Sequence, residues 1–115
     1  MNKQIFIRIY IMILNEFSKY LQANTKKIIS EKVSTTKLLC DWIKIVIYKN
    51  PKSNIEKIVH KEITLAENKS GDFLIVGKSP SGRVLVNALY NFALSYEHYI
   101  MQKWIADKKP ADFSL

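Results

Sequence analysis

Residues 79–106 read SPSGRVLVNALYNFALSYEHYIMQKWIA, and this stretch decides the fold. Ser79-Pro80 places a capping residue before a proline at the first helical position. Apolar residues then recur in a 4-3-4-3 rhythm, the spacing of one helix face, at Leu85, Leu89, Phe92, Tyr96 and Tyr99. The pattern predicts a helix from Ser79 to about Ala106, which would be about 40 Å long at about 1.5 Å per residue.

Two earlier segments also carry helical periodicity. Apolar residues recur every four positions from Ile5 to Leu21, well past strand length, so helix is favoured over strand although Ile5–Ile13 is rich in β-branched residues. This helix continues or restarts through residues 28–29. Ser34 is placed to cap a second helix that runs to about Tyr48 and ends before Asn50-Pro51.

The segment after Pro51 supports two interpretations. Ser53-Asn54-Ile55-Glu56 is a capping box, and a narrow apolar stripe favours a third helix that Gly71 could close. The alternative is that residues 62–67 and 72–77 pair as a β-hairpin across Asn68–Gly71. We predict a mainly α fold, a compact bundle of about four helices with a long C-terminal helix, and leave open a small hairpin near 62–77.

Bulk composition sets the class of protein. At 115 residues, with 48% hydrophobic residues and only three glycines and three prolines, the chain predicts one ordered domain over 1–115. Its single cysteine, Cys40, excludes an internal disulfide and fits a reducing compartment. The most apolar run, Ile5–Leu14, is interrupted by Arg8 and is too short to cross a bilayer. We therefore expect a cytoplasmic protein that does not bind membranes.

Positive charge is concentrated in one part of the chain. The stretch from Lys19 to Lys61 holds ten lysines and three acids, and nearly all of the net charge of +8 lies there. Such asymmetry points to an anionic partner. Part of it could instead be compositional, because the chain is also rich in Ile and Asn, which AT-rich coding favours together with Lys. Sixteen of the eighteen basic residues are lysines, which suit phosphate contacts better than base reading.

Candidate nucleic-acid-binding residues follow from this charge. We expect lysines of this stretch to converge into one positive surface: Lys26, Lys27, Lys37, Lys44 and Lys57. A second candidate surface is the entrance of the last helix, where Lys78 and Arg83 flank free backbone N–H groups and the positive end of the helix dipole.

Catalytic and metal-binding patterns are not found in the sequence. His60 and His98 are isolated, and one cysteine with two separate histidines lacks the paired spacing of a zinc site. Cys40 beside Leu39 and Trp42 is expected to be a small core residue, with Trp42 buried near Leu38 and Val46. We predict no enzyme activity, no cofactor, no metal and no small-molecule substrate.

Three functions are compatible with these observations. The favoured one is a basic helical accessory subunit of a larger complex, which binds RNA or DNA through its phosphate backbone without sequence preference. In size and character, though in no motif, the chain resembles the small subunits of CRISPR surveillance complexes. The alternative is a protein antagonist, such as an immunity or anti-defence protein, that binds an acidic protein partner. The third is an assembly subunit without a charged ligand.

Overall fold

The computed structural model of the protein describes residues 3–108, and the side chains of residues 7–103. In this range the chain forms helices and one hairpin, in the order α1 (Lys3–Ala23), α2 (Thr25–Ser30), α3 (Thr35–Ile47), α4 (Asn54–Glu62), β1 (Ile63–Glu67), β2 (Phe73–Gly77) and α5 (Pro80–Lys108). The prediction of a mainly helical fold is confirmed. The long C-terminal helix is also present, and α5 is the longest element of the described chain.

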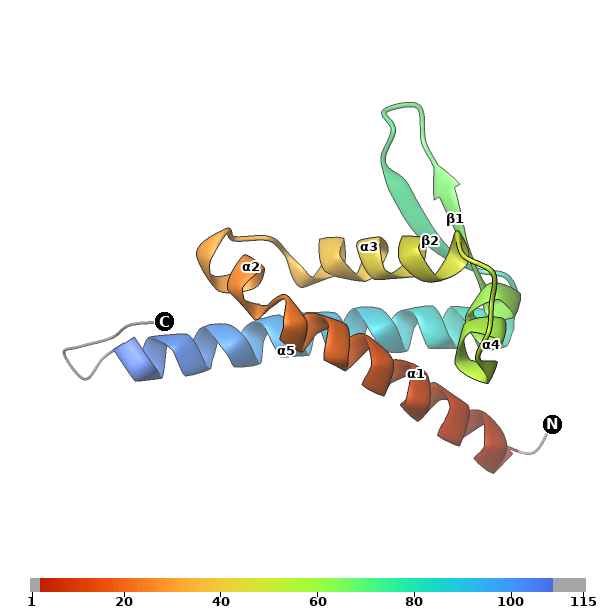
Figure 1. Cartoon of the computed structure of the whole chain (residues 1–115), viewed down its shortest axis with the longest axis horizontal. Coiled ribbons are helices and arrows are strands. Elements are labelled where there is room, and N and C mark those ends of the chain that lie inside the picture. Colours follow the sequence, from red (N-terminus) through yellow and green to blue (C-terminus); the bar gives the residue numbers. More distant parts are fainter. Residues whose placement is uncertain (1–2, 109–115) are drawn as a thin grey trace.

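α5 is the element around which the others pack. It contacts each of the other helices and both strands. Figure 1 shows α3 lying along α5, α1 crossing it and α4 near its first turns, while the hairpin projects on the side of α3 away from α1. The residues that attach α5 to this assembly are those of its predicted apolar face or next to it, namely Leu85, Val86, Leu89, Ala93 and Ile100.

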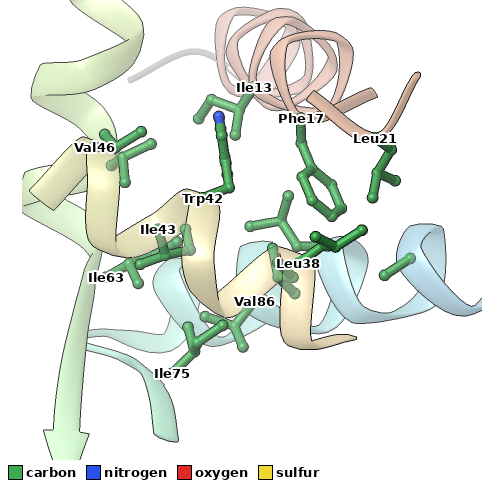
Figure 2. Packing of buried hydrophobic residues seen from close by; sticks show 14 of the residues in the cluster. Ile13, Phe17, Leu21, Leu38, Trp42, Ile43, Val46, Ile63, Ile75 and Val86 are labelled. Atoms are coloured by element: carbon green, nitrogen blue, oxygen red, sulfur yellow. The ribbon is translucent and has the colours of Figure 1, made fainter. Parts of the chain in front are cut away.

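The core lies between α1, α3 and α5. Trp42 is only 8% exposed and belongs to the same buried cluster as Leu38 and Val46, which confirms its predicted position. Its ring centroid is 5.4 Å from that of Phe17 on α1. Figure 2 shows both rings among the aliphatic side chains of the cluster. Burial of this apolar surface is the main favourable term in folding, and it places α3 between α1 and α5.

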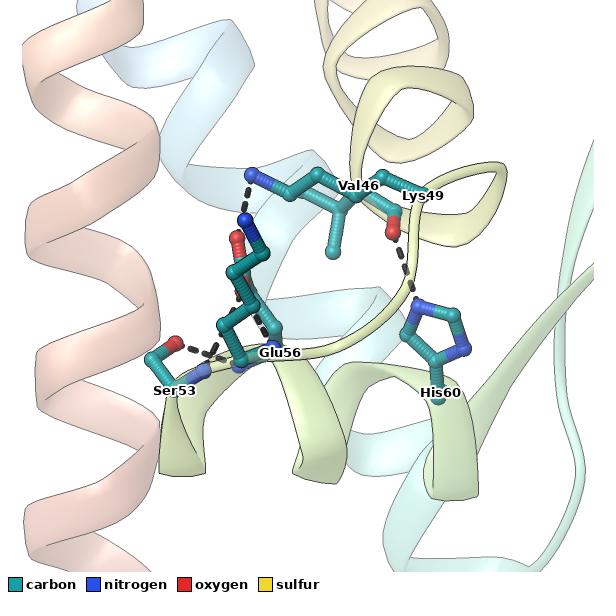
Figure 3. Close-up of polar contacts among 6 residues, drawn as sticks. Val46, Lys49, Ser53, Glu56 and His60 are labelled. Carbon is teal, nitrogen blue, oxygen red and sulfur yellow. Dashed lines mark hydrogen bonds and ion pairs between the residues drawn. The ribbon is translucent and has the colours of Figure 1, made fainter.

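Helix ends follow the polar residues that the sequence places there. Ser34 caps α3, since its Oγ accepts the N–H of Lys37. Ser53 and Glu56 form the expected capping box at the start of α4, which Figure 3 shows together with Lys49. Between α1 and α2 the chain breaks at Asn24, whose side-chain amide donates to the carbonyl oxygen of Tyr20 at 2.7 Å. The first helix therefore restarts as α2 instead of continuing.

The segment after α4 differs from the helix that we expected. α4 ends at Glu62, and β1 pairs antiparallel with β2, from Ile63 opposite Gly77 to Glu67 opposite Phe73. The expectation of a helix closed by Gly71 is therefore wrong, and the hairpin alternative is correct. Both strands contain β-branched residues and β2 adds the aromatic Phe73, a composition that favours this pairing.

Turn chemistry completes the hairpin. Gly71 has φ of 85°, a backbone conformation that side chains with a Cβ rarely adopt. Asn68 Oδ1 accepts the N–H groups of Ser70 and Asp72 at 2.9 and 3.0 Å. Ile63 and Ile75 turn one face of the hairpin into the core, whereas Leu74 points to solvent. The turn and the buried face together set the register.

Candidate nucleic-acid interface

One face of α3 opens into a hollow beside the hairpin, called here the α3–hairpin hollow. Lys37, Asp41 and Lys44 recur at helical spacing on this face. The start of α3 is anchored to α5, because the buried Thr35 hydroxyl donates to the carbonyl oxygen of Ala93 at 2.7 Å. The hollow has a volume of about 510 Å³ and is lined by Ser34, Thr36, Lys37, Cys40, Asp41, Lys44, Gly71, Asp72, Phe73 and Tyr90.

Charges in the hollow are balanced. Lys37 Nζ lies 3.4 Å from Asp41 Oδ2 one helical turn further on. Lys44 Nζ lies 3.9 Å above the centre of the Phe73 ring, a cation–π contact that joins α3 to β2. Asp72 supplies a second carboxylate from the hairpin turn. The hollow therefore offers ammonium donors and two aromatic rings, Phe73 and Tyr90, without a strong net charge of its own.

The thiol in the hollow is not an activated nucleophile. Burial raises the pKa of Cys40; the nearby Lys44 lowers it, Asp41 raises it and Lys37 lowers it by smaller amounts. Burial likewise raises the pKa of the Tyr90 hydroxyl. Both groups therefore stay protonated at neutral pH, and a thiolate is what nucleophilic chemistry would require. Cys40 is half-buried at the rim of the core, slightly more accessible than expected.

The entrance of α5 is already occupied by a carboxylate of the chain itself. Glu62, only 7% exposed, accepts hydrogen bonds at Oε2 from the hydroxyls of Ser79 at 2.8 Å and Ser81 at 2.9 Å. Ser79 Oγ also accepts the N–H of Gly82 at 3.1 Å. A helix N-terminus favours an anion, and here Glu62 supplies it from the end of α4.

The two basic residues at this entrance are consequently not poised around a vacant anion position. Lys78 Nζ donates to the carbonyl oxygen of His60 at 2.8 Å, close to the C-terminus of α4. Arg83 is exposed on the first turn of α5. His60 in turn bonds through Nε2 to the carbonyl oxygen of Val46 at 2.8 Å, which Figure 3 shows. These contacts fasten helix ends and leave the entrance without an open site.

The other candidate lysines line different parts of the surface. Lys26 and Lys27 are exposed on α2, and Lys26 borders a separate hollow of about 370 Å³ with Thr25, Ile29 and Ser30. Lys57 is exposed on α4 and borders a groove against α1. Of the expected set, the structure brings Lys37 and Lys44 to one hollow and distributes the remaining lysines over other elements.

Sequence reasoning did not single out the aromatic members of the hollow. Phe73 was read only as part of a strand that competed with a helix, and Tyr90 lies off the main apolar stripe of α5. The aromatic residues of that stripe lie in different surroundings: Phe92 and Tyr96 pack against the core, whereas Tyr99 is exposed. The side chain of Trp104 lies outside the described residues.

The described range holds neither a metal-binding cluster nor a membrane-spanning helix. Among residues 3–108, no group of three or more His, Cys, Asp or Glu side chains is arranged to hold a metal ion. No helix of that range has the length and hydropathy needed to span a membrane. Comparison of the chain with models of protein families, with curated proteins and with solved structures found no match. The assignment of a function therefore rests on the geometry of the described residues.

Proposed function

We propose that the protein is a non-enzymatic accessory subunit that binds the phosphate backbone of nucleic acid, with the α3–hairpin hollow as its contact surface. The observation that carries this proposal is the convergence of Lys37 and Lys44 on one hollow that also exposes Phe73 and Tyr90. The two lysines are seven residues apart on α3, about 10 Å along the helix axis. They can therefore contact different phosphates of one strand.

The arrangement favours a polymer over a small anion. Asp41 and Asp72 offset the two lysines, so the hollow does not concentrate charge as a closed phosphate pocket would. The net charge of +8 acts over the whole molecule and attracts a polyanion more strongly than it attracts a small anion. The rings of Phe73 and Tyr90 can add contacts to unpaired bases, which favours a single strand.

Lysine chemistry also sets the expected specificity. Ammonium groups are mobile point charges and do not read base edges as a guanidinium fork does. We expect binding to RNA and DNA alike, with little dependence on sequence and strong dependence on salt. Binding in place of catalysis is supported by Cys40, whose thiol burial keeps protonated, and by His60, whose ring is engaged with a backbone carbonyl.

The test compares two double variants that remove the same charge from different faces. Lys37→Gln/Lys44→Gln alters the hollow, and Lys57→Gln/Lys61→Gln alters the exposed side of α4. Fluorescence anisotropy with labelled single-stranded oligonucleotides should show weaker binding for the hollow variant at about 0.1 M salt. Its plot of log affinity against log salt should be less steep by about 0.7 per lost contact. The α4 variant should retain the slope of the wild-type protein.

A chemical footprint locates the contact without mutation. Cys40 is the single cysteine of the chain and lines the hollow. An oligonucleotide bound there should slow alkylation of Cys40 by iodoacetamide, and high salt should restore the rate. If both double variants bind like wild type and Cys40 is not protected, the hollow is not the nucleic-acid contact. If the wild-type protein does not bind nucleic acid at all, the alternative function is favoured, namely an antagonist that binds an acidic protein.

A further inference from the structure

The first half of α1 exposes apolar side chains that the fold does not use. Ile7 is 57% exposed, Ile11 50% and Met12 48%, although all three belong to the most apolar run of the chain. In Figure 1 this part of α1 extends past α4, on the side of the molecule away from the hairpin. Clusters of exposed large apolar residues mark interaction surfaces more often than scattered ones do.

A groove lies between this part of α1 and α4, called here the α1–α4 groove. It has a volume of about 360 Å³ and is lined by Ile9, Met12, Asn54, Ile55, Lys57 and Ile58. Four of these six side chains are apolar, and Met12 is an adaptable side chain suited to contact surfaces. The groove adjoins a smaller hollow of about 210 Å³, with which it shares Ile55.

Cations flank the groove on both helices. Lys57 and Lys61 are exposed one turn apart on α4, and Arg8 is exposed one turn before Met12 on α1. None of these three makes an ion pair with the side chains of residues 7–103. The acids nearest in sequence are all engaged elsewhere. Glu16 and Glu56 are paired with Lys19 and Lys49, and the buried carboxylate of Glu62, next to Lys61, accepts hydrogen bonds from the hydroxyls of Ser79 and Ser81. The rim of the groove is therefore positively charged.

We propose that the α1–α4 groove docks an amphipathic helix of a partner protein, with its apolar row in the groove and acidic residues along its edges. A concave apolar channel between two helices is the shape that accepts the side chains of a helix. The cations on both sides select acidic flanks, because complementary charge sets register and excludes wrong partners. The docking surface is separate from the α3–hairpin hollow, and the inference stands whether or not the hollow binds nucleic acid.

Charge decides against a second copy of the chain as the occupant of this surface, and shape decides against a bilayer. A second copy of the chain would bring Arg8, Lys57 and Lys61 against the same basic face across a two-fold axis, and like charges repel there. A bilayer would meet the exposed Ile7 and Ile11, but it would leave the concave floor of Ile55 and Ile58 unfilled. Only a protruding row of side chains fills both the floor and the rim.

The experiment uses synthetic helical peptides as probes. One set has about 18 residues with leucine at i, i+4, i+7 and i+11 and glutamate flanking this row, and the matched set replaces each glutamate by lysine. Binding to the full chain is measured by anisotropy of the labelled peptide. We expect the glutamate-flanked peptides to bind about tenfold more tightly than the lysine-flanked ones, with the difference shrinking as salt rises.

Matched variants assign the binding to the groove. Met12→Gln should weaken binding of the glutamate-flanked peptides at least about threefold, whereas Leu94→Gln should not, since Leu94 is similarly exposed but lies on α5. Lys57→Gln/Lys61→Gln should abolish the preference for glutamate over lysine flanks. Circular dichroism melting checks that each variant folds, which we expect because Met12 and Leu94 are both exposed.

Three results would overturn the inference. The first is that no glutamate-flanked peptide binds at about 1 mM, or that the lysine-flanked set binds equally well. The second is that the wild-type protein is a dimer by light scattering and that Met12→Gln makes it monomeric. The third is that vesicles containing phosphatidylserine bind the protein through Ile11 and Met12 while the peptides do not.

Discussion

The carboxylate of Glu62 accepts a hydrogen bond from the Ser79 hydroxyl at 2.8 Å, and this contact joins the end of α4 to the entrance of α5 across the hairpin. Ser81 donates to the same oxygen at 2.9 Å. The backbone closes the joint as well, because the N–H of Lys78 donates to the carbonyl oxygen of Glu62 at 2.8 Å. These three hydrogen bonds fix the orientation of the hairpin relative to α5.

We predict that Glu62→Ala lowers the free energy of unfolding by about 1–3 kcal/mol, because it leaves two partly buried hydroxyls without their acceptor. Urea denaturation followed by circular dichroism measures the change. Glu67→Ala on the exposed end of the hairpin is the control and should have little effect. If Glu67→Ala lowers the free energy of unfolding as much as Glu62→Ala does, the hydrogen bonds of Glu62 make no specific contribution to stability.

We predict that Gly82→Ala is destabilising although alanine normally strengthens a helix. An added Cβ at residue 82 would lie 2.3 Å from the carbonyl oxygen of Glu62, so backbone must move. Overpacking of this kind costs about 1–3 kcal/mol. The melting temperature should fall relative to wild type, whereas Ser95→Ala on the exposed side of α5 should leave it unchanged or raise it.

We predict that Trp42→Ala costs about 3–5 kcal/mol, since it removes a buried ring that packs on Phe17. Guanidinium denaturation followed by circular dichroism gives the value. Tyr48→Ala on the same stretch of chain is the control, because Tyr48 is exposed and should cost less than about 1 kcal/mol.

We predict that stability falls in acid partly through Glu56. Hydrogen bonding to Lys49, and then to the backbone N–H groups of Lys52 and Ser53, lowers the pKa of Glu56 to about 2. The unfolded chain has the ordinary value of about 4.3, so the contribution is complete above that pH and is lost as pH falls toward 2. In Glu56→Gln the denaturation midpoint should drop less between pH 5 and pH 2 than in wild type, a difference that Glu67→Gln should not show.

We predict that charge reversal of Lys26, Lys27 and Lys37 together weakens nucleic-acid binding to all sequences alike. The three lysines lie on α2 and α3, and Lys26 and Lys27 border no part of the hollow. The affinity of the triple variant is compared with that of Lys37→Glu alone. Equal affinities indicate direct contact at Lys37, whereas weaker binding of the triple variant indicates general electrostatic attraction by Lys26 and Lys27. If the triple variant binds like wild type, the lysine excess is compositional.

Local sequence predicted α3, α5 and the start of α4, because the signals for these features lie within a few residues of one another. The Ser34 cap, the Ser53–Glu56 capping box and the 4-3-4-3 pattern of α5 each report a short-range property. Residues 63–77 were harder, since an apolar stripe at helical spacing competed with strand-forming residues and a turn. The packing of Ile63 and Ile75 into the core settles that competition.

The candidate sites were predicted less completely from the sequence than the helices were. The sequence identified Lys37 and Lys44, but it did not place Phe73 and Tyr90 beside them, and those residues come from elements 29 or more positions away. It also predicted an anion position at the entrance of α5 without showing that Glu62 occupies it. Contacts between distant segments depend on how the helices pack, which no local pattern encodes.

The sequence by itself determined the class of fold, both ends of α3, the start of α4, the long α5 and the excess of positive charge. Tertiary structure alone decided that β1 and β2 pair, that Glu62 fills the helix entrance and that Lys37 and Lys44 share a hollow. It also decided that Ile9 and Met12 of α1 line a groove beside α4. The physical reason is the distance along the chain over which each effect acts. Backbone propensity and capping act over about one helical turn, whereas burial and charge complementarity are settled only when segments distant in sequence meet.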